Sequence, residues 1–238
     1  MIDKIQSDQV QVLLIGVRND AGTSIAVHKV DLAIGACTVQ PSLLRPEGLV
    51  IVDCMAGRLP DGRIVCAGTT HKNFSSEKRF DENSEDVYEE DSEVDDGVGL
   101  QYAMGQVLEP PPRGSPSDAS WQWRSLPGTN VGHFSGSGCM LSDGRFAVFG
   151  GLDSYDACTL SCEVLTLDAD GEGWDLISPM HEPRQSFACA AIGGCVIVAG
   201  GIGSVTAEVY EEELGRWRRL PCNLPYDSEL FWMGSAVI

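Results

Sequence analysis

The chain has 238 residues, of which 43% are hydrophobic, and it carries a formal net charge of -19. This charge argues against non-specific binding to nucleic acids or anionic membranes, because both depend on clustered Lys and Arg. A basic protein is the more compatible partner. Glycine is abundant, with 27 residues, and the apolar residues rarely follow helical spacing, so the composition predicts an all-β chain of short strands.

The N-terminus and the cysteines bear on where the protein is found. Met1 is followed by Ile-Asp-Lys rather than by a basic segment and a long apolar run, so we expect no signal peptide. The longest apolar stretch near the N-terminus is about half of the ~20 residues that a membrane-spanning helix needs. Nine cysteines are an odd number, and several lie within apolar strands. We therefore expect thiols, a reducing compartment, and a cytoplasmic or nuclear protein.

The first half of the chain reads as strands around an acidic insertion. Strands are predicted at residues 10–16, 25–32, 37–44, 49–59, 64–68, 100–108 and 120–126. Pro60-Asp-Gly-Arg63 is a typical hairpin turn between two of them. Residues 70–99 interrupt the pattern, with eleven acidic and two basic residues between positions 77 and 96. Such a segment buries too little apolar surface to order itself, so it is predicted to be a disordered insertion. It would either keep the protein soluble or attract a basic ligand.

The second half of the chain contains a repeat. Residues 184–201 read as two apolar strands that are joined by Gly193-Gly194 and end on Gly200-Gly201. Residues 134–151 have the same order 50 positions earlier and end on Gly150-Gly151. Further strands are predicted at residues 131–141, 145–150, 160–168, 174–178, 184–192, 195–200, 206–212 and 216–220. Two markers keep the same period, namely Trp123, Trp174 and Trp217 on the last strand of a unit, and Glu163-Val-Leu165 with Glu208-Val-Tyr210 on the third.

These markers resemble the blades of kelch-type β-propellers, in which each repeat is a four-stranded antiparallel sheet. The residues that carry the resemblance are Gly150, Gly151, Trp174, Gly200, Gly201, Tyr210 and Trp217. We assign them a structural role. The glycines allow tight turns and close backbone approach, and each Trp fills the space between adjacent blades.

The resemblance implies one propeller over residues 1–238, with about four blades and an incomplete ring. Its units are a partial repeat at 1–47, full repeats at 48–130, 131–181 and 182–226, and a partial repeat at 227–238. Residues 180–221 most resemble the kelch half of plant-type F-box/kelch proteins, whose propellers present substrates to a ubiquitin ligase. This chain contains no F-box-like helical segment, so ligase subunits are expected as partners only if an F-box lies outside it.

Within a propeller, the connections between blades and those from the second to the third strand share one face. Loops on a rigid scaffold usually carry recognition. Six loop residues are therefore candidates for partner contact, namely Arg45, His133, Tyr155, His181, Arg184 and Tyr226. For Arg184 a bond to a neighbouring loop is an equal alternative, and for the two histidines a structural role is the favoured interpretation.

The predicted function is a non-catalytic protein-interaction module, in its most specific form the substrate-recognition part of a ubiquitin-ligase adaptor. The alternatives are a stand-alone kelch scaffold and a copper-radical oxidase that resembles galactose oxidase. The four histidines are scattered along the chain, so convergence on copper is not expected. Cys158 and Cys162 lack a second cysteine pair for zinc. No helix follows Gly200-Gly-Ile-Gly203 to make a phosphate-binding loop. We expect no catalytic set, metal or cofactor.

Overall fold

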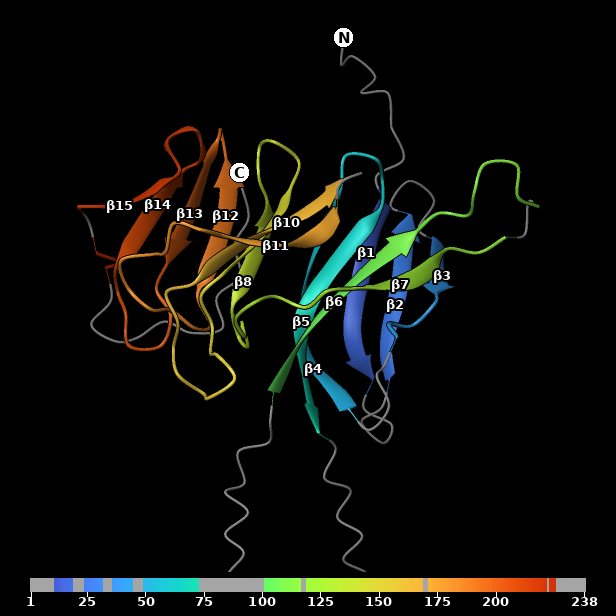
Figure 1. Cartoon of the computed structure of the whole chain (residues 1–238), viewed down its shortest axis with the longest axis horizontal. Coiled ribbons are helices and arrows are strands. Elements are labelled where there is room, and N and C mark those ends of the chain that lie inside the picture. Colours follow the sequence, from blue (N-terminus) through green and yellow to red (C-terminus); the bar gives the residue numbers. More distant parts are fainter. Residues whose placement is uncertain are drawn as a thin grey trace, which may run out of the picture.

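The structure, a computed structural model, describes residues 11–18, 24–31, 36–44, 49–72, 101–116, 119–168, 171–221 and 223–225. These residues form four antiparallel sheets that lie side by side in chain order (Figure 1). The first sheet has three strands in the order β1-β2-β3. Its strands are β1 (Gln11–Arg18), β2 (Ser24–Asp31) and β3 (Ala36–Gln40).

Each of the other three sheets has four strands, and neighbours in sequence are neighbours in the sheet. The second sheet contains β4 (Leu49–Arg58), β5 (Ile64–Lys72), β6 (Gln101–Glu109) and β7 (Gln122–Leu126). The third contains β8 (Ser137–Met140), β9 (Phe146–Phe149), β10 (Cys162–Asp168) and β11 (Gly171–Ile177). The fourth contains β12 (Ala188–Ile192), β13 (Cys195–Ala199), β14 (Ala207–Glu211), a 3₁₀ turn η1 (Glu212–Leu214) and β15 (Arg216–Arg219).

The all-β fold class and the four-stranded units are confirmed, and several strand limits differ from the prediction. β8 and β12 begin several residues later than expected because Ser135 and Ser186 adopt φ of +54° and +55°, which ends extended structure. β5 continues to Lys72, because Thr69 and Thr70 still pair with β6. The acidic insertion therefore cannot begin at residue 70. Residues 73–99 and 227–238 lie outside the described part of the chain.

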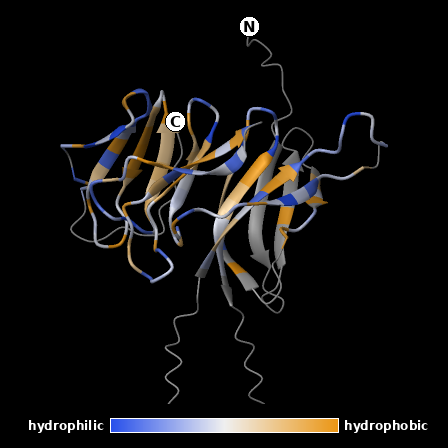
Figure 2. Ribbon diagram, in the orientation of Figure 1, coloured by the Kyte–Doolittle hydropathy of each residue, from blue (hydrophilic) through white to orange (hydrophobic). Residues whose placement is uncertain are grey.

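The hydrophobic core lies between the sheets rather than within any one of them. One cluster joins the first two sheets through Val27, Leu43, Met104 and Trp123. A second joins the second and third sheets through Val65, Val107, Phe146 and Trp174, and a third joins the last two through Phe149, Val164, Val198 and Trp217. In Figure 2, hydrophobic residues concentrate along the strands, while the connecting loops are more hydrophilic. Each sheet thus depends on its neighbour to bury its apolar face.

The first strands of neighbouring sheets also meet. β8 contacts both β4 and β12, although the three strands belong to separate sheets. Within the described ranges, no helix has the length and hydropathy needed to cross a membrane.

Candidate interaction face

Two kinds of connection emerge at the same end of the sheets. In an antiparallel sheet whose strands follow in order, the loop from the second to the third strand lies at the end where the chain leaves for the next sheet. We call the connections between sheets the links; within the described residues they are 41–44, 127–136 and 178–187. The links and the second-to-third-strand loops at 150–161 and 200–206 together form what we call the link face.

The third strand of each four-stranded sheet carries a buried polar side chain that holds the preceding link. In the second sheet this residue is Gln106, which is 2% exposed. Its Oε1 accepts a hydrogen bond from the Leu44 backbone N–H at 2.8 Å, and its Nε2 donates to the Leu44 carbonyl at 2.5 Å. A neutral amide suits this position because it meets one donor and one acceptor.

In the third sheet the equivalent residue is Glu163, which is fully buried. Its carboxylate accepts the backbone N–H groups of Asn130 and Val131, both at 2.8 Å, and the Asn130 side-chain amide at 2.8 Å. His133 Nε2 lies 3.2 Å away from it. Burial alone would raise the pKa of Glu163, but the hydrogen bonds from His133, Asn130 and Val131 outweigh burial and hold that pKa below its usual value.

His133 lies between two hydrogen-bond acceptors. Its side chain is 2% exposed, and Nδ1 lies 2.6 Å from the Gly150 carbonyl while Nε2 faces the Glu163 carboxylate. A carbonyl and a carboxylate both only accept hydrogen bonds, and a neutral imidazole ring donates to one of them. His133 and Glu163 are thus a buried pair whose contact is an ion pair when the ring is protonated.

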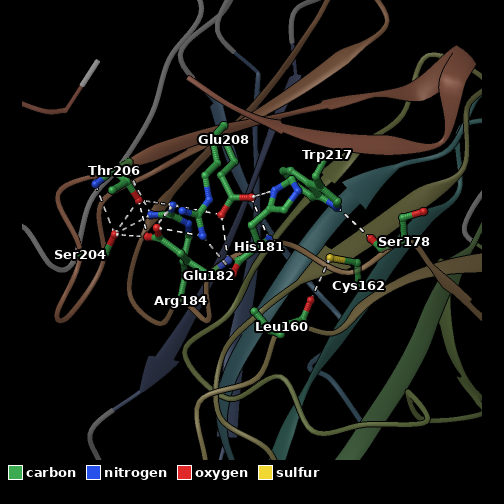
Figure 3. A network of polar contacts seen from close by, with 11 residues as sticks. Leu160, Cys162, Ser178, His181, Glu182, Arg184, Ser204, Thr206, Glu208 and Trp217 are labelled. Carbon is green, nitrogen blue, oxygen red and sulfur yellow. Dashed lines mark hydrogen bonds and ion pairs between the residues drawn. The ribbon is translucent and has the colours of Figure 1, made fainter. Parts of the chain in front are cut away.

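In the fourth sheet Glu208 repeats the pattern (Figure 3). Its carboxylate accepts the backbone N–H groups of His181 at 2.8 Å and Glu182 at 3.1 Å. His181 Nδ1 lies 2.8 Å from the same carboxylate, so that nitrogen is the donor. Arg184 supplies the cation, with Nη2 at 3.2 Å.

Arg184 is 0% exposed and lies among acceptors from the 200–206 loop (Figure 3). Its Nη1 donates to the carbonyls of Gly200 and Thr206 and to the Ser204 hydroxyl, and its Nη2 donates to the Thr206 hydroxyl. Glu182 completes the cluster by accepting from Thr206 and Ser204, and the first of these hydrogen bonds is the main cause of its lowered pKa. The last link and the last loop of the link face are thus fixed to one another.

The tryptophans of the fourth strands form a second hydrogen bond to each link. The indole N–H donates to a backbone carbonyl of the preceding link in each of these sheets: Trp123 to Pro41 at 2.8 Å, Trp174 to Pro127 at 3.0 Å, and Trp217 to Ser178 at 2.8 Å. We call the combination of third-strand polar residue, fourth-strand indole and preceding link the link clamp. It recurs at all three junctions between the described sheets.

The link at 127–136 is also joined to β4 and to the link at 178–187. The backbone N–H of Ser135 donates to the Asp53 carboxylate at 2.6 Å, and the N–H of Ser186 donates to the Ser135 carbonyl at 2.7 Å. Burial raises the pKa of Asp53 despite its hydrogen bonds from Ser135 and Thr69.

Tyr155 lies at the tip of a rigid loop on the link face. The Asp153 carboxylate accepts the backbone N–H groups of Tyr155 at 2.8 Å and Ala157 at 3.0 Å, and the Asp153 N–H donates to the Ala157 carbonyl. Leu152 forms bridges with Phe134 on one side and Cys158 on the other. The Tyr155 side chain is nevertheless 84% exposed. An aromatic side chain on a fixed backbone is a typical interaction anchor.

The structure separates the six predicted contact residues. Tyr155 is exposed, and the His181 side chain is 46% exposed. His133 and Arg184 are buried in link clamps, so we assign both a structural role in place of partner contact. For Arg184, this is the alternative given above, in which it bonds to a neighbouring loop. Arg45 and Tyr226 lie outside the described residues.

The sequence interpretation did not anticipate the clamping role of Gln106, Glu163 and Glu208. The available signal was an acid repeated inside apolar third strands, which is rare unless the charge is paired. The predicted structural glycines do meet crowded or left-handed positions. A Cβ on Gly151 would lie 2.6 Å from the Phe134 carbonyl, and one on Gly201 would lie 2.8 Å from the Gln185 carbonyl.

The opposite end of the sheets carries a shallow acidic pocket of about 600 Å³. It is lined by Ser142, Asp143, Gly193, Gly194, Cys195, Glu211, Glu212, Glu213 and Leu214. Several of these carboxylates already have partners, since Glu211 pairs with Arg216 and Arg218, and Glu212 accepts from Ser142. In the described ranges, no three His, Cys, Asp or Glu side chains converge in a way that could hold a metal ion. The link face is therefore the better candidate for function.

Comparison with known proteins agrees with the fold. No model of a known protein family matches the chain. Among curated proteins, the F-box/kelch-repeat protein At1g16250 of Arabidopsis thaliana is 30% identical over 117 residues, which cover 42% of this chain and 30% of that protein. Among solved structures, YjhT matches with a TM-score of 0.57 at 12% identity, over 94% of this chain and 68% of that one.

These comparisons and the sheet topology confirm the resemblance to kelch-repeat propellers. The fold is a kelch-type β-propeller, in which each four-stranded sheet is a blade. The similarity to the Arabidopsis protein spans less than a third of that protein's length.

Proposed function

We propose that this chain is a non-catalytic kelch-type propeller that binds another protein through its link face. One observation carries the proposal: the link face presents exposed side chains on backbones that are already held by buried hydrogen bonds. Such a surface loses little conformational entropy when it binds. The similarity to a kelch-repeat protein supports the same general role.

Tyr155 is the first contact that we assign. It is the most exposed of the large hydrophobic side chains in the described chain, at 84%. Aromatic residues dominate the energetics of protein interfaces because they bury a large area with few rotatable bonds. The flanking residues Asp153 and Asp156 are acidic, so the partner's pocket for Tyr155 is expected to have a basic rim.

His181 is the second contact. Its Nδ1 donates to Glu208, and this bond fixes the orientation of a ring that remains half exposed. Ile202, which is also exposed, lies on the loop that Arg184 holds beside the same link. Together these residues give the link face a mixed polar and apolar character, which is usual for interfaces that form and dissociate.

The partner that we propose is a basic protein. The net charge of -19 favours encounters with positively charged surfaces and disfavours anionic ones. The finer proposal is that the bound protein is a substrate that the propeller presents to a ubiquitin ligase in the cytoplasm or nucleus. Its support is the word F-box in the name of the Arabidopsis relative. A stand-alone scaffold is the alternative.

The test uses the full chain immobilised as bait, with Tyr155→Ala and Leu214→Ala as a matched pair of variants. Leu214 is 58% exposed and lies in η1, at the end of the sheets opposite the link face. Quantitative mass spectrometry should show proteins that the wild type and Leu214→Ala retain and Tyr155→Ala loses. All three baits should unfold at the same temperature.

Equal retention by Tyr155→Ala and the wild type would overturn the assignment of the link face. The ligase proposal has its own readout, which needs an F-box segment joined to this chain: ubiquitylation of the retained protein should rise when that fusion is co-expressed and should not rise with its Tyr155→Ala variant. Retention without a change in ubiquitylation would favour the scaffold.

A further inference from the structure

Two pairs of cysteines are neighbours in this protein. All eight described cysteines are thiols rather than disulfides. The neighbouring Cys66 thiol is the main cause that lowers the pKa of Cys54, and the neighbouring Cys189 thiol is the main cause that raises the pKa of Cys139. The first pair lies within one blade, on β4 and β5. The second pair joins two blades, because Cys139 lies on β8 and Cys189 on β12.

Cys139 and Cys189 lie on strands that contact one another, since β8 and β12 are the first strands of neighbouring blades. Both side chains pack against the same hydrophobic cluster between these blades. Neither cysteine is fully buried.

The pair within the blade is less suited to a disulfide. Cys54 is in register with Gly68, and Cys66 is in register with Ala56, so the two cysteines are diagonal neighbours on adjacent strands. The Cα atoms of such neighbours are about 7–8 Å apart. A disulfide needs about 4.4–6.8 Å, so this pair would have to distort the sheet. No ladder of backbone hydrogen bonds imposes a diagonal register between β8 and β12, since they belong to different sheets.

We propose that Cys139 and Cys189 form a reversible disulfide that links the first strands of two neighbouring blades. The oxidant is a small disulfide of the glutathione type. One of the two thiolates attacks it, forms a mixed disulfide and releases one thiol. The other cysteine sulfur then attacks the protein sulfur of the mixed disulfide and releases the second thiol. One small disulfide is reduced to two thiols while one disulfide forms in the protein.

The neighbouring Cys189 thiol, together with burial, raises the pKa of Cys139 above its usual value. The thiolate is the nucleophile, so these surroundings do not activate Cys139. The second attack is favoured once a mixed disulfide is held beside the remaining thiol. The disulfide would add a covalent bond to a junction that is otherwise held by apolar packing and a link clamp.

The experiment incubates the full chain with oxidised glutathione, blocks the remaining thiols and maps the peptides without reduction. The expected product has lost the mass of two hydrogens and contains a peptide in which Cys139 is bonded to Cys189. Its midpoint of thermal unfolding should rise by about 5 °C or more, because the cross-link restricts the unfolded chain. Dithiothreitol should reverse both changes.

Cys139→Ser and Cys54→Ser are the matched variants. Cys54→Ser should still form the linked peptide and show the thermal shift, whereas Cys139→Ser should show neither. The peptide map of the wild type does not depend on how either variant folds. Mixed glutathione disulfides alone, or a linked peptide that mainly joins Cys54 to Cys66, would overturn the proposal.

Discussion

Buried charges are the unusual feature at the scale of single residues. Glu163 and Glu208 are fully buried, which is costly unless the charge is paired. Each carboxylate meets backbone N–H groups of a link and one basic side chain, His133 or Arg184. These groups take the place of the water that the charges lose on folding. The same carboxylates tie each link to the blade that follows it.

Glu163→Gln should lower stability in a manner that depends on pH. The folded-state pKa of Glu163 is held below its unfolded value, so the ionised form favours folding. This contribution is fully present above about pH 4.3, the unfolded value, and is lost as pH falls through the folded pKa. The stability difference between wild type and Glu163→Gln, measured by urea unfolding, should therefore be largest near pH 7 and shrink below about pH 4.3. A difference that does not change with pH would contradict a stabilising role of the ionised carboxylate.

Arg184→Met should destabilise the chain by about 3–5 kcal/mol, because it leaves Glu208 buried with no cation. Arg218→Met is the matched control, since Arg218 is half exposed and pairs with a carboxylate at the surface. Urea unfolding should show little change for the control. Similar losses for both variants would mean that the buried pair adds nothing beyond a surface pair.

At the scale of elements, the fourth strand supplies both packing and a hydrogen bond through its Trp. Trp174 packs edge to face against Phe146, with ring centroids 6.4 Å apart, and donates to the Pro127 carbonyl. Trp217 packs in the same way against Phe149, at 5.8 Å. One side chain thus fills the space between blades and fixes the link beside it.

Replacing Trp174 should separate these two contributions. Trp174→Ala should cost about 3–5 kcal/mol, because it opens a cavity in the cluster between two blades. Trp174→Phe keeps a ring and loses the indole N–H, so it should cost about 1–3 kcal/mol. Thermal and urea unfolding measure both. A Phe variant as stable as the wild type would show that the bond to Pro127 does not stabilise the link.

The turn glycines differ in what surrounds them, and this difference is testable. Gly151 has φ of +92°, and an added Cβ would lie 2.6 Å from the Phe134 carbonyl. Gly193 also has positive φ, at +58°, but an added Cβ would meet nothing within 4 Å. Gly193→Ala should cost about 1–2 kcal/mol, from backbone conformation alone. Gly151→Ala should lower the free energy of unfolding clearly more than this. Equal losses for the two variants would show that the contact between the added Cβ and the Phe134 carbonyl does not destabilise the fold.

At the scale of the whole molecule, a row of blades shares one construction. Every junction between the described blades has an apolar cluster between the two sheets and a link clamp at the link face. The clamps are internal, so the exposed side chains on the same face remain available for a partner. Stability depends on the buried clamp residues, whereas Tyr155 lies on a separate loop of the same face; His181 serves both, since Nδ1 bonds Glu208 and the ring is half exposed.

The net charge predicts how a partner should bind. If the partner is basic, its affinity should fall as salt rises from about 50 to 300 mM, because screening shortens the reach of the charges. Deleting residues 73–99, which contain eleven acidic residues, should weaken binding and reduce the salt dependence. Calorimetry or surface plasmon resonance measures both effects. Unchanged affinity after the deletion would show that this segment does not attract the partner.

Local chemistry accounts for what was predictable from the sequence. Alternating and continuous apolar runs mark the strands, Gly193-Gly194 marks a two-residue hairpin, and the repeated Trp residues mark the fourth strands. These signals act between residues that are close along the chain, so they were sufficient for the fold class and most strands. Tyr155 could be placed in an exposed loop for the same reason.

The tertiary structure alone decided which polar residues face inward. His133 and Glu163 are 30 positions apart, and Arg184 and Glu208 are 24 apart. They meet only because a link from one blade crosses the third strand of the next. A cation in a loop has the same local sequence signature whether it pairs with a distant carboxylate or faces solvent. The burial of Arg184 and His133, and the later starts of β8 and β12, follow from that long-range packing.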